Sequence, residues 1–271
     1  MSSTTLTPIE ATQLSRALDK RLQTARRLAT EAGAVALRMR PPPGAATANL
    51  KGAQDWLTEA DGRIEAMLAK GLAEAHPEDG FAGEETGHGR DGAWRWVVDP
   101  IDGTSNYARG ASRWCVSLGL VADRTPLLGV VNSPATGELF AARLGGGATR
   151  NGVGIGVATT TDPTRAMVEI GWSPRVPVPD YLAVTERVMA LGIMPRSNGS
   201  GAMGLADVAC GRLDGYIERH IQLWDVAGIL PILAEAGARI SPFMDGDAVT
   251  RGGPIVVGAP GVFDALNRVA G

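Results

Sequence analysis

The sequence predicts an α+β protein in which sheets and helices are stacked in layers, and three observations support this prediction. Apolar residues recur at helical spacing over residues 14–39 and 64–72. Four short runs rich in β-branched and apolar residues, separated by turn residues, lie within residues 94–142 and predict a mostly antiparallel sheet. Beyond residue 150, helix-like and strand-like segments alternate. Elements of this kind bury their apolar faces by packing as layers around a core.

The first predicted helix begins at Thr7-Pro8-Ile9-Glu10, which has the form of a capping box with proline at the first helical position. The prolines at 41–43 end it. Residues 41–52 are rich in Pro, Gly and Ala without periodicity and predict an exposed loop with Lys51 near its end. The apolar positions of this helix are Leu14, Leu18, Leu22, Ala25, Leu28, Ala32, Val35 and Met39.

A second helix is predicted across residues 64–72, and strands are predicted at 94–99, 114–122, 127–133 and 138–142. Aromatic residues at strand spacing in an acidic chain favour core packing or a dimer face over base stacking. These aromatic residues are Trp94, Trp96, Tyr107 and Trp114.

The C-terminal part predicts helices at 185–192, 204–213, 224–237 and 263–270 and a strand at 254–259. Pro231 is expected to kink the helix at 224–237. No repeat or linker forces a boundary, so residues 1–271 are interpreted as a single unit. A soft division separates an α+β half, residues 1–150, from a smaller α/β half, residues 151–271.

Composition narrows the classes of function. The chain has 271 residues, 44% of them hydrophobic, and a formal net charge of -3, which provides no basic surface for nucleic acid or an anionic membrane and favours a small ligand. Cys115 and Cys210 lie too far apart to suggest a disulfide framework or a zinc site, which indicates a reducing, cytoplasmic compartment. The first thirty residues contain no apolar run that predicts a signal peptide or a membrane span.

Acidic residues supply the strongest functional signal. Asp99 and Asp102 lie three residues apart where an apolar run breaks into a Gly-Thr turn, and each alone is an ordinary turn or cap residue. Together they can point at one cation, while Gly103 permits close approach and Thr104 opens a helix whose free amides favour phosphate. Further acids precede or open predicted elements, namely Glu84 and Glu85 in FAGEETG, Asp55 and Asp61 in DWLTEAD, and Asp225 in WDVAG.

An acid cluster repels itself when empty, which raises carboxylate pKa values, and Mg²⁺ relieves that repulsion. The three histidines stand apart from one another, so oxygen ligands for a hard metal are favoured over a zinc site.

These residues resemble the magnesium-dependent inositol monophosphatase family of the sugar-phosphatase superfamily. The matching motifs, in the family's order, are DWLTEAD (55–61), GEE (83–85), DPIDGTSN (99–106), RSNGSGAMGLADVACGRLDGYIE (196–218) and WDVAG (224–228). The resemblance covers the chain from about Leu14 onward and implies a layered αβαβα sandwich.

The resemblance also implies roles at matching positions. One Mg²⁺ would be held by Glu84, Asp99 and the Ile101 carbonyl, and a second by Asp99, Asp102 and Asp225, so that four carboxylates balance two divalent ions. Lys51 would lie near a third, weaker ion that Glu84 shares, and Glu85 is a further candidate. Asp61 and the Thr104 hydroxyl would orient and deprotonate a metal-activated water, without a covalent intermediate.

The implied substrate is a small polyol phosphate, first of all myo-inositol 1-phosphate. Its phosphate would meet the amides of Gly103 and Thr104, and its hydroxyls would meet Glu218 and Asp225, with Ser200 and Ala202 as the inner wall. Glu218 would equally pair with an amine, so histidinol phosphate and adenosine 3′,5′-bisphosphate stay open as substrates. The segments Arg219-His220-Ile221-Gln222 and Trp172-Ser173-Pro174 match no substrate pattern.

Three other classes of protein have features that can be compared with this sequence. A haloacid-dehalogenase-type phosphatase needs DxDGT and a downstream lysine, whereas this chain has DxxDGT and lysines only at 20, 51 and 70. A nucleotide kinase needs a GxxxxGK[ST] loop, which the sequence lacks. A catalytically silent scaffold on the same fold stays an alternative, although every implied ligand is present. The family resemblance also implies a homodimer and inhibition by lithium.

Overall fold

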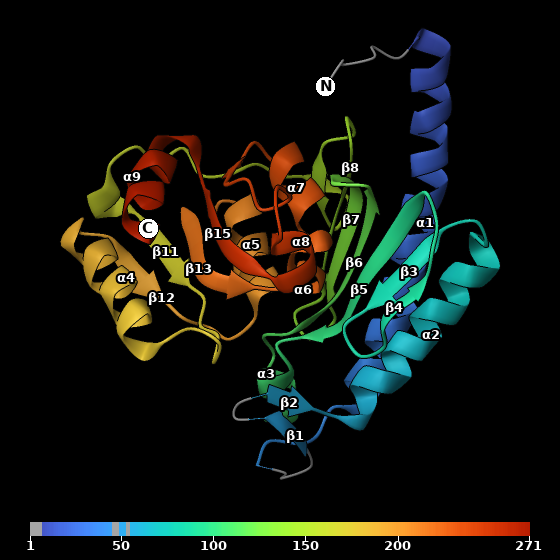
Figure 1. Ribbon diagram of the computed structural model, residues 1–271, viewed down its shortest axis with the longest axis horizontal. Helices are drawn as coiled ribbons and strands as arrows, with labels where there is room; N and C mark the ends of the chain where they lie inside the picture. Colours follow the sequence, from blue (N-terminus) through green and yellow to red (C-terminus); the bar gives the residue numbers. More distant parts are fainter. Residues whose placement is uncertain (1–6, 45–48, 53–54) are drawn as a thin grey trace.

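The computed structural model describes residues 7–44, 49–52 and 55–271, with backbone alone at Pro8, 49–52 and 55–57 (Figure 1). Helix α1 (Pro8–Met39) begins at Thr7, whose hydroxyl accepts from the Glu10 N–H at 3.3 Å while its own N–H donates to the Glu10 carboxylate at 2.8 Å. The predicted capping box is therefore confirmed, and the helix ends just before the prolines at 41–43. The predicted second helix is α2 (Glu59–Ala75).

The prediction of a loop over residues 41–52 is wrong for residues 49–52. Residues 49–52 form strand β1 (Asn49–Gly52), which pairs antiparallel with β2 (Asp55–Leu57). Backbone pairing over so short a stretch needs no alternation of side chains, so the composition gave no signal for it. The backbone of Lys51 lies in β1, and its side chain lies outside the described residues.

The large sheet has eight strands in the order β10-β9-β8-β7-β6-β5-β3-β4. Among the described strands of this sheet, β3 and β5 pair in parallel and the other neighbours pair antiparallel, which confirms the mostly antiparallel prediction. The four predicted runs correspond to β5 (Trp94–Asp102), β6 (Cys115–Ala122), β7 (Thr125–Ser133) and β8 (Glu138–Arg143). The strands of this large sheet that the sequence did not predict are β3 (Gly80–Gly83), β4 (Gly87–Arg90), β9 (Ala148–Arg150) and β10 (Val153–Gly154).

The smaller sheet has five strands in the order β12-β11-β13-β15-β14. Its strands are β11 (Met167–Ile170), β12 (Met194–Arg196), β13 (Gly215–Ile221), β14 (Arg239–Ile240) and β15 (Gly253–Gly258). The remaining helices are α3 (Thr104–Ala108), α4 (Val178–Ala190), α5 (Gly201–Ala209), α6 (Leu223–Ala227), α7 (Leu230–Glu235), α8 (Ala248–Arg251) and α9 (Pro260–Ala270), with a 3₁₀ turn at Pro163–Arg165.

These elements stack as five layers, in agreement with the predicted αβαβα sandwich (Figure 1). Helices α1 and α2 pack on one face of the large sheet, and α5 and α7 share a core with its other face and with β13 and β15. Helices α4 and α9 cover the far face of the smaller sheet. Among the described helices, none is long and apolar enough to cross a membrane.

The aromatic side chains in and beside the large sheet lie in the core, as their spacing predicts. Trp96, Tyr107 and Trp114 are fully buried, and the Tyr107 and Trp114 rings meet edge to face with centroids 4.9 Å apart. The Tyr107 hydroxyl donates to the Ala36 carbonyl at 2.8 Å, which ties α3 to α1. Trp94 is partly buried beneath the Arg21 guanidinium, 4.4 Å from the ring centroid.

The predicted kinked helix at 224–237 is instead two short helices, α6 and α7, separated by Gly228. Pro231 lies in the first turn of α7, where its missing N–H breaks no helical bond. A Cβ atom on Gly228 would lie 2.4 Å from the Ser117 hydroxyl oxygen, so the elbow between the helices packs directly on the large sheet. The predicted helix at 204–213 also ends early, because Gly211 adopts a φ of +73°.

Candidate active site

A bulge at the end of β5 turns two aspartates toward the same side. Side chains three residues apart on a regular strand point to opposite faces of a sheet. Here Asp99 pairs with Ser117 and Asp102 pairs with Cys115, so β5 contains one more residue than β6 over this interval. The extra residue brings both carboxylates to the edge that faces α6.

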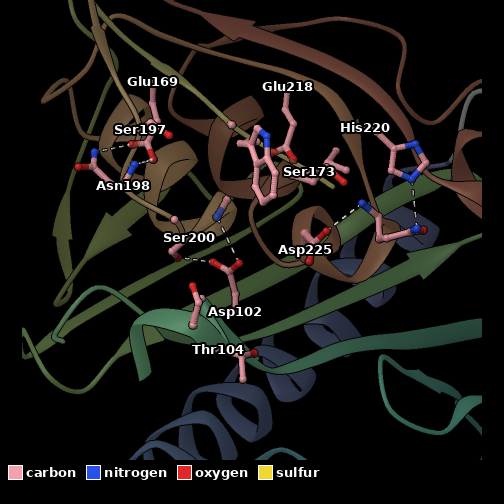
Figure 2. A pocket seen from close by; sticks show the side chains of 18 of the residues that line it. Asp102, Thr104, Glu169, Ser173, Ser197, Asn198, Ser200, Glu218, His220 and Asp225 are labelled. Carbon is pink, nitrogen blue, oxygen red and sulfur yellow. Dashed lines mark hydrogen bonds between the residues drawn. The ribbon is translucent and has the colours of Figure 1, made fainter. Parts of the chain in front are cut away.

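The third member of the cluster is Asp225, in the first turn of α6. Its carboxylate accepts the Gln222 N–H at 2.8 Å, which fixes the start of the helix. Carboxylate oxygens of Asp99, Asp102 and Asp225 all lie within 4.8 Å of one another. Figure 2 shows Asp102 and Asp225 facing each other across the floor of a cleft. The structure therefore brings together three of the predicted metal ligands.

Burial and mutual repulsion shape the charge of this cluster. Burial, followed by the charges of Glu84, Asp102 and Asp225, raises the pKa of Asp99 well above its usual range. Burial and the charge of Asp102 raise the pKa of Asp225 to about 8. Carboxylates that share so small a space lose protons reluctantly unless a cation is present. The all-oxygen donor set fits a hard divalent ion such as Mg²⁺.

Asp102 also fixes the start of α5, on the other side of the cleft. Its carboxylate accepts the Ser200 hydroxyl proton and the N–H groups of Gly201 at 3.2 Å and Ala202 at 2.9 Å. These hydrogen bonds oppose the effect of burial, which still raises the pKa of Asp102. Ser200 lines the cleft, whereas Ala202 is fully buried behind it and contributes its backbone N–H to Asp102. The predicted contact of Ala202 with substrate stays a prediction.

Thr104 and Asp61 meet beside the cluster. The Thr104 hydroxyl oxygen lies 2.9 Å from the Ile101 carbonyl oxygen and 3.3 Å from Asp61 Oδ1. Asp61 Oδ2 accepts the Thr58 N–H at 2.8 Å and the Thr58 hydroxyl at 2.6 Å, so this pair fixes the start of α2. Burial raises the pKa of Asp61. Gly103 precedes Thr104 with a φ of +87° and packs so tightly that a Cβ atom there would lie 2.9 Å from the Arg113 carbonyl oxygen.

The two predicted glutamates after β3 have different surroundings. Glu84 lines the cleft, and its charge acts on Asp99. The Glu85 N–H donates to Glu65 Oε2 at 2.8 Å, and the Glu85 charge raises the pKa of Asp61. Glu65 is buried on α2 and also accepts the Thr86 N–H at 2.9 Å, so it fixes the turn that presents Glu84. Sequence reasoning missed Glu65, although a carboxylate beside the apolar position Ile64 was a signal.

The cleft has a volume of about 690 Å³, and part of its wall comes from the two segments that matched no substrate pattern, residues 172–174 and 219–222. Trp172 is 45% exposed at its edge, and Arg175, His220 and Gln222 also line it. On the same wall, burial raises the pKa of Glu218 to about 8, so this carboxyl is largely protonated near neutral pH, and the Tyr216 hydroxyl is its hydrogen-bond partner. No side-chain periodicity marks these loops, which explains why the sequence did not reveal them.

Glu169 links this wall to the acid cluster. It is buried, and it accepts the Asn198 N–H at 3.1 Å, the Asn198 side-chain amide at 3.0 Å and the Arg113 guanidinium at 3.0 Å. Asn198 lies two residues before Ser200, so Glu169 fixes the segment that positions the hydrogen bonds to Asp102. Figure 2 shows this chain of contacts from Glu169 to Asp102.

Solved structures resemble the fold over nearly its whole length. The inositol monophosphatase of Anabaena (Nostoc) sp. superposes with a TM-score of 0.80 at 32% identity and covers 93% of this chain and 95% of its own. The extragenic suppressor protein suhB of Bartonella henselae superposes with a TM-score of 0.84 at 29% identity and covers 94% of this chain and 98% of its own. The fold and the acidic cleft define a phosphoric monoester hydrolase.

Sequence comparison identifies the family. The chain belongs to the inositol monophosphatase family, which it matches over residues 17–268. The inositol-1-monophosphatase of Rhizobium meliloti is 35% identical over 226 residues, which make up 82% of this chain and 85% of that protein. The Nus factor SuhB of Xylella fastidiosa is 38% identical over 200 residues, 73% of each chain. Members of the family depend on a metal, typically Mg²⁺.

Proposed function

We propose that this protein hydrolyses the phosphate monoester of a small polyol, with myo-inositol 1-phosphate as the first substrate to test. The observation that supports this most directly is the meeting of Asp99, Asp102 and Asp225 at the floor of a cleft whose wall presents Glu218. The similarity to the inositol-1-monophosphatase of Rhizobium meliloti adds support.

The proposed metal site combines the three carboxylates that lie within 4.8 Å of one another, those of Asp99, Asp102 and Asp225, with two ligands that the family resemblance implies, Glu84 and the Ile101 carbonyl. Glu84, Asp99 and the Ile101 carbonyl would hold one Mg²⁺, and Asp99, Asp102 and Asp225 would hold a second. Bound Mg²⁺ supplies Lewis-acid activation of both water and the phosphate group. A third ion near Lys51 and Glu84 stays a prediction from the family resemblance.

The chain's own residues would move the proton. The Thr104 hydroxyl lies between Asp61 and the Ile101 carbonyl, so it can accept a proton from the attacking water while it donates its own to Asp61 Oδ1. Because Thr58 occupies Asp61 Oδ2, Oδ1 is the oxygen that faces Thr104. The water oxygen forms the new bond to phosphorus, the bond to the alcohol oxygen breaks, and solvent in the open cleft protonates the alcohol. Asp61 then releases its proton.

The test is phosphate release from myo-inositol 1-phosphate, histidinol phosphate and adenosine 3′,5′-bisphosphate, first with Mg²⁺ and then with EDTA. Mg²⁺-dependent release from the inositol ester well above the other two supports the proposal. A preference for either of the others keeps the reaction and changes the substrate.

A second candidate is a factor of the SuhB type, because the relative in Xylella fastidiosa is named a Nus factor. Absence of phosphate release from all three esters, in a protein whose melting temperature still rises with Mg²⁺, would favour this candidate or the silent scaffold. The homodimer predicted from the family is tested by light scattering, and lithium inhibition by the same phosphate assay.

A further inference from the structure

The lining of the cleft contains five acids and one arginine among the described residues. Of the described residues that line it, Arg175 is the one arginine or lysine, and it comes from the loop between β11 and α4. His220, at the end of β13, lies on the same wall. The acids that line the rest of the cleft are Glu84, Asp102, Glu169, Glu218 and Asp225.

Arg175 has no ion-pair partner among the described residues, although five acids line the same cleft. Arg113, by contrast, pairs with both Glu169 and Asp207 at about 3 Å. A turn fixes the loop around Arg175: the Arg175 N–H donates to the Ser173 hydroxyl oxygen at 3.3 Å, and the Val176 N–H donates to the Ser173 carbonyl at 3.1 Å. The turn therefore presents an unpaired guanidinium at the edge of the cleft.

His220 lines the same cleft as Arg175 and contributes an imidazole to it. Burial, followed by the charge of Arg175, lowers the pKa of His220, which favours the neutral imidazole. The Gln222 side-chain nitrogen lies 3.3 Å from His220 Nε2. An amide nitrogen only donates, so Nε2 accepts and the proton resides on Nδ1.

Gln222 connects His220 with the acid cluster. Its side chain contacts His220, while its backbone N–H donates to Asp225 at 2.8 Å. His220 thus lies one residue's length from the acid cluster, and Arg175 lines the same cleft.

We propose that Arg175 and His220 form an anion subsite, and that the preferred substrate contains a second anionic group, a phosphate or a carboxylate, besides the phosphate that is hydrolysed. This inference rests on the proposed function. The four acids of the metal site already balance two divalent ions, so a second anion needs a separate cation. A guanidinium meets the oxygens of either group with two parallel hydrogen bonds.

The experiment compares kcat/KM within two matched pairs of esters. The first pair is myo-inositol 1,4-bisphosphate against myo-inositol 1-phosphate, which adds a phosphate. The second is 3-phosphoglycerate against glycerol 1-phosphate, which replaces a neutral hydroxymethyl group with a carboxylate. We expect the member with a second anionic group to be preferred by about tenfold in at least one pair, the lower end for a charge-assisted bond because Arg175 is exposed. The pair that shows the preference identifies the anion.

Variants separate the subsite from general electrostatic attraction. Arg175→Gln is expected to reduce the preference to about onefold, and His220→Ala to reduce it less, because a neutral ring contributes only a donor. Arg268→Gln removes an equal charge from an exposed position at the end of α9 and is expected to leave the preference unchanged. No preference in either pair, or a preference that survives Arg175→Gln, overturns the inference.

The two proposals fail in different ways. If both members of each pair are hydrolysed equally, the anion subsite is refuted and the proposed function stands. If no ester is hydrolysed, the proposed function is refuted, and the shift in melting temperature produced by each ester still tests the subsite. A larger shift with the member that has a second anionic group, lost in Arg175→Gln, supports the subsite, and equal shifts refute it.

Discussion

The variant Asp102→Asn tests metal binding and fold stability separately, because the Asp102 carboxylate contributes to both. Its carboxylate lies within 4.8 Å of the oxygens of Asp99 and Asp225, where two unit charges at an effective dielectric constant of 20 repel by about 3.5 kcal/mol. Removing the charge relieves that repulsion in the metal-free protein at pH values above about 8, where Asp225 is ionised, so the melts are made there. The new amide nitrogen, however, faces one of the donors from Ser200, Gly201 or Ala202, at a cost of about 1–3 kcal/mol.

These opposing terms nearly cancel, so the melting temperature of Asp102→Asn in EDTA should stay within a few degrees of the parent protein. With Mg²⁺ the two proteins should diverge. A ligand at 100 times its Kd stabilises the parent by about 2.7 kcal/mol, which corresponds to roughly 5–10 °C in a chain of this size. The variant should lose most of this rise.

The assay is a thermal melt of both proteins in EDTA and in a Mg²⁺ titration, with phosphate release measured in parallel. We expect phosphate release by the variant to fall by orders of magnitude. A variant that keeps the full Mg²⁺-dependent rise and its activity refutes the assignment of Asp102 as a ligand. A variant that unfolds in EDTA refutes the balance of repulsion and hydrogen bonding.

Three further predictions concern pH, the proton path and the cleft wall. The pKa of Asp225 is raised to about 8 in the folded protein, above its value in the unfolded chain, so the metal-free protein should lose stability as pH rises from about 4 to about 8; melts in EDTA at pH 5 and pH 8 test this. Thr104→Ala and Asp61→Asn should lower kcat while the Mg²⁺-dependent rise in melting temperature persists, as melts and initial rates will show. Trp172→Ala should raise KM severalfold with little change in kcat, because the exposed indole at the edge of the cleft offers an apolar face on which we expect the substrate ring to pack; a full saturation curve tests this.

Each of these three predictions would be contradicted by a specific result. Constant or rising stability between pH 5 and pH 8 in EDTA would mean that the acid cluster is not protonated in the folded state. Loss of the Mg²⁺-dependent rise in Thr104→Ala would place Thr104 among the groups that bind metal. An unchanged KM in Trp172→Ala would place the substrate on another part of the wall.

Local signals in the sequence predicted the elements that are stabilised locally. The capping box at Thr7 and the prolines at 41–43 set the ends of α1 through interactions within a few residues. Strand β4 (Gly87–Arg90) was missed because it lies at the edge of the large sheet with its side chains mostly exposed, so it shows no apolar alternation. The break between α6 and α7 was missed because its cause, the packing of Gly228 on the large sheet, is tertiary.

The candidate site was predictable in its residue types and only partly in its arrangement. The acids of the motifs could be identified, and the resemblance assigned them roles that stay predictions. Their convergence depends on a bulge after Asp99, which spacing alone does not reveal. Glu65, Glu169 and the loop around Arg175 act through contacts with residues distant in sequence, and no local pattern marks such contacts.

The hydrogen bonds around the acid cluster join parts of the chain that are far apart in sequence. Ser200 and Asp102 are separated by 98 residues, and Thr104 and Asp61 by 43. Contacts between such distant residues form slowly, because loop closure must precede them. Recovery of the Mg²⁺ response after dilution from denaturant should therefore lag behind recovery of helical circular dichroism. The time at which the Mg²⁺ response recovers would then report when the two sheets dock.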